Sequence, residues 1–404
     1  MKNYIFKNAT VLTSEGLIEK SIAVSNGIIA QRPITNSKLI DGRGLLLAPA
    51  LIDIHGDAFE RSYMPRPNVF FPITTALIDI DRQLALNGIT TAFHALTLSW
   101  EPGLRSLENG KNFIENLLQL EQQMRIDHKV QLRWETFAEH AVSFIKGIIK
   151  KRPDYTLAFN DHTSMKMRAF DVNIQDREFE HSPDFRVASL SDARMKERNE
   201  ANAKRSGLST EEYILKLESV WNTKDQVMKN IESLSIEGRE RGIAMLSHDD
   251  TKIETRDFYN NLGISICEFP MTHEVASHAR KNNAHIVFGA PNVLRGGSHI
   301  GSPSAADMIE MGLCDILASD YAYSSMLSAL KKLESERNMS LTEIWKQVSL
   351  NPAKTLNLHD RGEISKGKRA DLVLLDWFKP QAPEVILTMS AGRIAYLNSD
   401  IVLP

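Results

Sequence analysis

Six polar side chains stand at the ends of apolar segments of the sequence, at the point where a buried strand would be followed by a turn. The segment APALIDIHGD is the clearest case, because its apolar run stops on a histidine and an aspartate two positions apart. Alternate side chains of a strand point to the same face, so this pair would project together. An apolar run is followed in the same way by each of His55, Asp57, Glu135, His162, His248 and Asp320.

These six side chains offer three imidazoles and three carboxylates, a donor set that suits Zn²⁺, Mn²⁺ or Fe²⁺. Gathering them without a cation would be costly, because buried carboxylates repel each other and unpaired polar groups are penalised. The sequence therefore predicts a centre for one or two divalent ions, with zinc the best match and Glu135 the carboxylate shared between two. The metal would lower the pKa of a bound water, and Asp320 is predicted to be the catalytic residue that takes its proton.

Two further segments predict an anion-binding site. In MPRP, Arg66 lies between two prolines, which restrict the backbone around it. In APNVLRGGSH, Arg295 is followed by two glycines and by the donors of Ser298 and His299, residue types that bind phosphate. We predict these four residues as substrate contacts and a small phosphorylated molecule as the substrate. A glycine turn carrying a surface arginine is the alternative for the second segment.

The elements that would position these residues are eight short apolar runs alternating with helical patterns, the signature of a parallel sheet. Predicted strands lie at 50–55, 88–96, 130–136, 155–161, 242–248, 263–269, 284–290 and 314–320. Eight strands predict a closed (β/α)8 barrel, in which the carboxyl ends of the strands meet on one face. A doubly wound open sheet is the competing α/β architecture, but no glycine-rich phosphate loop follows the first strand.

Both ends of the chain differ from this middle, because they consist of short strands with turn signals such as Asn26-Gly27. We predict a small composite β-sandwich domain from 1–48 and 362–404, and the barrel from 49–361. About eighty residues separate the fourth strand from the fifth, more than one crossover needs. They predict a helical insertion at about 165–240, with a long helix that starts at a capping box on Ser209 and runs to about 239. This insertion is either a lid over one end of the barrel or a solvated helical segment without a catalytic role.

Composition excludes several classes of protein. With 404 residues, 42% hydrophobic and 25% charged, the chain is an ordinary globular one. A net charge of −3 predicts no nucleic-acid partner, and no apolar run is long enough to predict a membrane span. Two distant cysteines in apolar segments predict no disulfide framework, and we expect a cytoplasmic protein. The sequence leaves open whether copies of the chain form a homo-oligomer.

The chain resembles the amidohydrolase superfamily in the segments ALIDIHGD, SHDD (247–250), ASDY (318–321), NPAKTLNL (351–358) and GKRADLVLLD (367–376). Within it, MPRPNVFFP, LSHDD, GAPNVLRGGSH and LASDY resemble a branch of phosphonate-metabolism hydrolases. This resemblance implies a metal-dependent barrel that cleaves a ribosyl triphosphate to the monophosphate and pyrophosphate. It matches the six strand-end residues to metal and catalytic positions, and Arg66 and Arg295 to phosphate contacts.

The chain departs from that branch at Ala58, His94 and Trp100, which we expect to line the pocket. His94 would either replace a ligand or shape the pocket. Because of these changes, a second hypothesis stays open, in which the same centre hydrolyses a C–N bond of an amide, cyclic imide or amidine. A third, a barrel that binds without catalysing, is disfavoured because all six candidate ligands are present.

Overall fold

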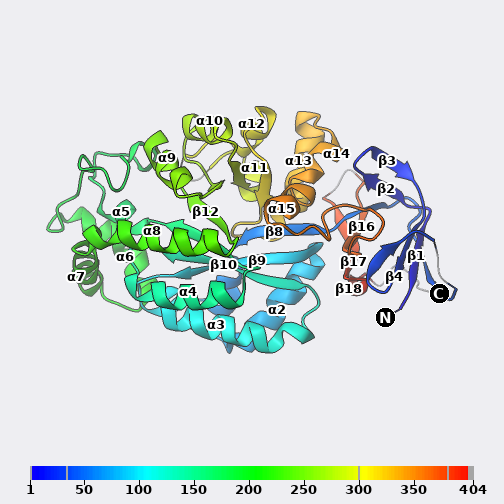
Figure 1. Ribbon diagram of the computed structural model, residues 1–404, viewed down its shortest axis with the longest axis horizontal. Helices are drawn as coiled ribbons and strands as arrows, with labels where there is room; N and C mark the ends of the chain where they lie inside the picture. The colour runs from blue at the N-terminus through cyan, green and yellow to red at the C-terminus, as the bar shows by residue number, and fades with distance from the viewer. Residues whose placement is uncertain (1, 33–34, 299–300, 380–381, 399–404) are drawn as a thin grey trace.

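The computed structural model describes residues 2–32, 35–298, 301–379 and 382–398. Its centre is an eight-stranded parallel sheet in sequence order, which confirms the predicted (β/α)8 barrel (Figure 1). The strands are β8 (Leu51–Gly56), β9 (Ile89–Leu98), β10 (Asp127–Glu135), β11 (Thr156–Asn160), β12 (Ala244–His248), β13 (Ile266–Glu268), β14 (His285–Gly289) and β15 (Ile316–Ala318).

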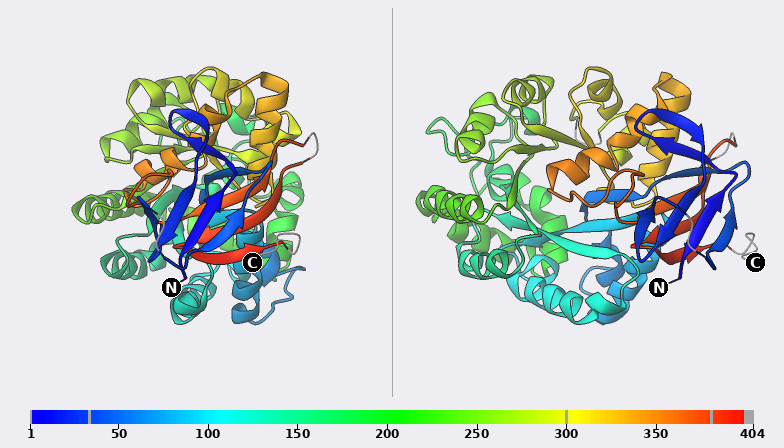
Figure 2. Two further views of the ribbon diagram at one scale, coloured as in Figure 1. Left: turned by 90° about the vertical axis from the view of Figure 1, so that its right-hand side faces the viewer. Right: turned by 45° about the vertical axis from the view of Figure 1, so that its right-hand side comes forward.

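Fifteen helices surround and extend the barrel within the described residues, and Figure 2 shows the ring that they form around its strands. They are α1 (Phe59–Tyr63), α2 (Ile73–Leu86), α3 (Leu107–Leu120), α4 (Val142–Lys151), α5 (His162–Met167), α6 (Arg194–Ser206), α7 (Thr210–Trp221), α8 (Lys224–Glu240), α9 (Ile253–Asn261), α10 (His273–Lys281), α11 (Ala290–Arg295), α12 (Ala305–Glu310), α13 (Ser325–Arg337), α14 (Leu341–Lys346) and α15 (Leu350–Thr355).

The first and last barrel strands meet through residues at their carboxyl ends. The N–H of Asp320 donates to the carbonyl of His55 at 2.9 Å, and the N–H of Asp57 donates to the carbonyl of Asp320 at 2.8 Å. Below them, the buried carboxylate of Asp53 accepts from the N–H and the Oγ of Ser319 at 2.9 and 2.6 Å. Barrel closure therefore fixes the backbone of three predicted site residues.

Strands from both ends of the chain pack on this barrel as two further sheets, as predicted. One has the order β5-β4-β1-β6 and the other β18-β17-β16-β7-β2-β3. Their bounds are β1 (Tyr4–Lys7), β2 (Thr10–Thr13), β3 (Gly16–Glu19), β4 (Ile22–Ser25), β5 (Ile28–Ala30), β6 (Lys38–Asp41), β7 (Leu46–Pro49), β16 (Leu372–Asp376), β17 (Glu384–Ser390) and β18 (Arg393–Leu397). The exact boundaries of the two domains stay a prediction.

The position of strand β16 explains the uninterrupted apolar run near the end of the chain. Leu372 and Leu374 pack in the core between the two terminal sheets, whereas Val373 and Leu375 pack in the core shared with the barrel helices. A strand buried on both faces needs an uninterrupted apolar run, which RADLVLLDW provides. The predicted hairpin at Asn26-Gly27 joins β4 to β5, and both residues have the positive φ (51° and 83°) that a type I′ turn requires.

The segment between β11 and β12 differs from its prediction. Ser209 begins α7 with the expected capping box, closed by Glu212, but the single long helix is wrong. The helix ends near Thr223, whose Oγ1 donates to the carbonyl of Val220 at 2.8 Å, and α8 then begins. Helices α6 and α7 lie at the opposite end of the long axis from the terminal strands (Figure 1). Among the described residues no helix combines the length and apolarity needed to cross a bilayer.

Candidate metal centre

Five of the six predicted strand-end residues belong to three groups of side chains whose donor atoms lie within 4.8 Å of one another. The groups share members and so form one continuous cluster at the carboxyl ends of the strands. They are His55 with Asp57 and Asp320, His55 with His248 and Glu268, and His162 with His248 and Asp249. The sixth predicted residue, Glu135, is tied to this cluster through His162.

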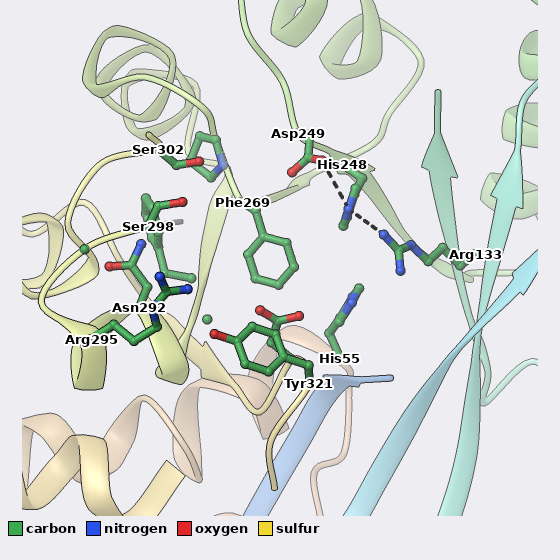
Figure 3. A pocket seen from close by; sticks show the side chains of 15 residues that line it. His55, Arg133, His248, Asp249, Phe269, Asn292, Arg295, Ser298, Ser302 and Tyr321 are labelled. Atoms are coloured by element: carbon green, nitrogen blue, oxygen red, sulfur yellow. Dashed lines mark hydrogen bonds and ion pairs between the residues drawn. The ribbon is translucent and has the colours of Figure 1, made fainter. Parts of the chain in front are cut away.

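Three cluster strands end in a left-handed backbone. Asp249, Phe269 and Asp320 have φ of 57°, 55° and 55°, values that are uncommon outside glycine. The N–H of Asp249 and that of Phe269 each donate to the next strand, at 3.0 Å from the carbonyls of Glu268 and Val287. The ring of Phe269 then packs edge-on against the rings of His55 and His248, with centroids 5.0 and 5.4 Å apart. The turn at each strand end therefore directs these side chains toward the cavity that they line, as Figure 3 shows for Asp249 and Phe269.

Glu268, which ends β13, is at the centre of the cluster, and sequence analysis missed it. Its fully buried carboxylate accepts from Nδ1 of His248 at 2.8 Å and from Nε2 of Gln131 at 2.9 Å. Burial would raise the pKa of Glu268, but His55 and His248 hold it well below its usual range. The signal was present, because the apolar run of ISICEF stops at Glu268, one residue before the end of the predicted strand.

Strand β10 presents a polar inner face, because alternate residues point the same way. Gln131 reaches Glu268, Arg133 reaches His248, and Glu135 reaches His162. The guanidinium of Arg133 was also missed. Its Nη2 donates to Nε2 of His248 at 2.9 Å, drawn as a dashed line in Figure 3, and its Nη1 lies 3.5 Å from Asp57. One cation of the protein therefore already lies among the predicted ligands.

The charge states of His248, His162 and Asp320 suit metal ligands, whereas that of His55 is set by its carboxylate neighbour. Burial, and then the neighbouring Arg133, lower the pKa of His248 to about 3, so its ring is neutral. Burial also lowers the pKa of His162, although the carboxylate of Glu135, 2.5 Å from Nδ1, opposes this. For His55 burial acts in the same direction, but Glu268 outweighs it and raises the pKa. Burial raises the pKa of Asp320 to about 6, so most of this carboxyl group is ionised at pH 7.

The arrangement fits a divalent cation. The buried Nδ1 of His55 lies 2.9 Å from Oε1 of Glu268 but has no aligned hydrogen bond. Two donor atoms facing each other in this way can both bind one positive ion, and imidazole nitrogen with carboxylate oxygen is a common combination at such ions.

A cavity of about 240 Å³ opens beside this cluster. In Figure 3, His55, His248 and Arg133 lie on one side of Phe269, and Asn292, Arg295, Ser298 and Ser302 lie on the other. Arg295 ends α11, and the two glycines after it end the helix, with φ of 75° at Gly296. The segment predicted to bind an anion thus faces the predicted ligands, except His299, which lies outside the described residues.

Other predicted pocket residues lie elsewhere. Arg66 is exposed on the loop between α1 and α2 and lines neither this cavity nor the second cavity described below. The ring of His94 packs against Phe59 of α1 and Phe113 of α3, on the helix side of the barrel wall. It therefore neither replaces a ligand nor shapes the pocket. Ala58 and Trp100 are buried and also line neither of these two cavities.

We expect His94 to make the stability of the protein depend on pH. Its Nε2 is 2.9 Å from Nδ1 of His128, and burial followed by the charge of His128 lowers the pKa of His94 well below 6.5. Below pH 6.5 the unfolded chain gains a proton there that the folded chain cannot accept, so stability falls as pH falls. Replacing His94 by Leu should make the loss of unfolding free energy with falling pH shallower by about 1.4 kcal/mol per pH unit.

Urea unfolding between pH 7.5 and 5.0 measures this slope, with His285→Leu, at an exposed histidine, as the control. An unchanged slope in His94→Leu would show that the buried ring takes up a proton in the folded state.

Comparisons with known proteins agree with this architecture. Residues 243–396 match the model of the amidohydrolase family. The chain is 32% identical over 378 residues to α-D-ribose 1-methylphosphonate 5-triphosphate diphosphatase of Escherichia coli (strain K12), covering 92% of this chain and 94% of that one. A dihydroorotase of Endomicrobium trichonymphae is 23% identical over 382 residues, 88% of this chain and 85% of the relative.

Among solved structures, a dihydropyrimidinase from Brevibacillus agri NCHU1002 superposes with a TM-score of 0.61 at 12% identity. The match covers 99% of this chain and 96% of that one, and at this identity it shows the shared fold alone. The relative at 32% identity, which extends over nearly the whole chain, shows more: the chain belongs to the amidohydrolase family and is a hydrolase that resembles the ribosyl triphosphate diphosphatase.

Proposed function

We propose that this protein is a metal-dependent hydrolase that cleaves a phosphoanhydride bond of a ribosyl 5-triphosphate and releases pyrophosphate. The main support is the cavity in which His55 and His248, with Glu268 buried behind them, face Arg295 and Ser298. A cluster of metal-ligating types opposite an arginine can hold a phosphate chain at the site of attack. The relative at 32% identity carries α-D-ribose 1-methylphosphonate 5-triphosphate in its name, and we take that compound as the candidate substrate.

The proposed ligands are the six strand-end residues together with Glu268, for one or two divalent ions. Zinc suits this nitrogen and oxygen donor set best, and manganese or iron(II) is compatible with it. When bound, the ion supplies Lewis acidity and a water of lowered pKa. Asp320 accepts a proton from the attacking water, which its raised pKa of about 6 suits. Arg295 and Ser298, and His299 by its place in the same segment, bind the phosphates.

The direct test is pyrophosphate release from α-D-ribose 1-methylphosphonate 5-triphosphate by protein that carries zinc or manganese, with metal content measured by plasma mass spectrometry. Protein stripped of metal is the control. Release that requires the metal is the expected result. No release by protein with a full metal complement would contradict the proposal.

Hydrolysis of a C–N bond by the same centre is the second candidate, favoured by the dihydroorotase relative. Arg295 separates the two candidates. For a phosphoanhydride substrate, Arg295→Gln should raise KM about tenfold with little change in kcat, because a charge-assisted contact to the phosphates is lost. Arg66→Gln is a matched control at an arginine outside the cavity. Equal KM values for Arg295→Gln and the unaltered protein would favour the C–N substrate.

A further inference from the structure

A second cavity of about 220 Å³ lies on the insertion side of the cluster. Glu135 and His162 line it, whereas His55, His248 and Asp320 line the first cavity. The predicted metal ligands therefore stand between two cavities. A substrate whose reacting bond lies at these ligands can extend into both.

The wall of this second cavity carries five cationic side chains, namely Arg105, Lys166, Arg168, Arg198 and Arg205. Two carboxylates pair with three of them: Arg105 makes two 2.9 Å bonds to Glu60, and Glu101 binds both Lys166 and Arg205, at 2.7 and 2.8 Å. These ion pairs join the loop after β9, which carries Glu101 and Arg105, to α1, α5 and α6, so the wall is built from elements that hold one another in place.

Arg168 and Arg198 remain without a carboxylate partner within 4.0 Å among the described residues. Arg168 donates to the carbonyls of Val172 and Met165, at 3.1 and 2.8 Å. Arg198 donates to the carbonyls of Lys166 and Arg168, at 2.9 and 2.5 Å. Burial and nearby arginines lower the pKa of Arg168, and that of Arg198 to about 10. Each guanidinium is thus half-buried beside like charge, and an anion in the cavity would offset that charge.

We propose that this second cavity is a subsite for the phosphate chain of the substrate, with Arg168 and Arg198 as its main ligands and Lys166 and Arg205 in support. Arginines present several N–H donors in a fixed plane, which matches phosphate oxygens. The two terminal phosphates would lie in this cavity, beyond the metal ligands Glu135 and His162. The phosphate next to the sugar, with the remainder of the substrate, would lie in the first cavity beside Arg295. This inference rests on the proposed function, but its test does not.

The test is isothermal titration of inorganic pyrophosphate into the metal-loaded protein and its variants, with metal content measured in each sample. Arg168→Gln and Arg198→Gln should each raise Kd about tenfold, since each removes a charge-assisted contact. Arg186→Gln is the matched control, because Arg186 is an exposed arginine of the same insertion that lines neither cavity and pairs with Asp171.

Because both arginines also brace backbone carbonyls, a third variant leaves these bonds intact. Asn202 lines the second cavity, and its Oδ1 accepts from Arg205 at 3.1 Å, a bond that an aspartate can keep. Asn202→Asp adds a negative charge and should raise Kd at least tenfold by repelling pyrophosphate. Asn222→Asp, at the exposed end of α7, is its control.

Pyrophosphate binding within twofold of the unaltered protein in Asn202→Asp would overturn the inference, and loss of binding only in Arg295→Gln would assign the anion to the first cavity. The release assay judges the function separately. Weaker binding in these variants, with no release by the unaltered protein, would keep the subsite and reject the phosphoanhydride substrate. Pyrophosphate release by the unaltered protein, together with unchanged pyrophosphate binding in the variants, would support the phosphoanhydride substrate and reject the subsite.

Discussion

Asp320→Asn is expected to lower kcat by about a thousandfold, the usual size of a general-base contribution. The side chain lies within reach of His55 and Asp57, at the end of the last barrel strand. The amide of asparagine cannot accept the proton of an attacking water, and it is a poorer metal ligand than a carboxylate. Single-turnover and steady-state rates, with metal content measured in the same samples, test this expectation.

The same variant should keep its fold. Barrel closure depends on the backbone N–H and carbonyl of Asp320, which asparagine retains, and asparagine tolerates a φ of 55° as well as aspartate does. We expect an unchanged circular dichroism spectrum and a Tm within a few degrees. Asp184→Asn, at an exposed aspartate of the insertion, is the control. Near-normal turnover in Asp320→Asn would reject the role proposed for this residue.

Glu268→Gln is expected to remove the metal and to destabilise the protein. The carboxylate lies between the imidazoles of His55 and His248 and also accepts from Gln131. A glutamine must turn its NH₂ toward one of these donors, and the buried charge that the histidines face disappears. Removing one partner from such a buried network costs about 3 kcal/mol. Metal content, urea unfolding and activity, which should fall together, are the measurements.

Glu274→Gln, on the exposed side of α10, removes a carboxylate from the surface and should change none of these quantities. A Glu268→Gln protein that retains a full metal complement and ordinary activity would show that this carboxylate only orients its neighbours. A stable protein without metal would separate binding of the ion from folding.

Much of the fold could be predicted from the sequence, because barrel strands have a strong local signature. All eight predicted runs contain a strand, since each is an apolar stretch of the right length between helical patterns. The insertion was harder. The side chain of Thr223, between α7 and α8, donates to the backbone carbonyl of Val220, and a periodic pattern does not reveal such a break.

The candidate site could be predicted best where a residue ends a strand, although the segment after α11 also brings Arg295 and Ser298 to the cavity as predicted. His55 and Asp320 converge because parallel strands end on one face. Arg66 lies on a loop outside both cavities, and the position of a loop depends on tertiary contacts that the sequence does not specify. His94 does not line the pocket as expected, because it lies within β9 and its side chain faces the helices. Arg133 could have been found from the alternation of QLRWE, whose third and fifth residues share a face.

The junction between β8 and β15 has a consequence for biosynthesis. The hydrogen bonds that join Asp53 to Ser319 span 266 positions of the chain, so the ribosome must make most of the protein before this contact can form. A loop of that length is slow to close, and pairings so distant raise the contact order of the fold. The full set of candidate metal ligands is therefore complete only after the last barrel strand has docked. Nascent chains cannot assemble the whole candidate metal centre. Uptake of the ion should then follow folding in time and stabilise its product.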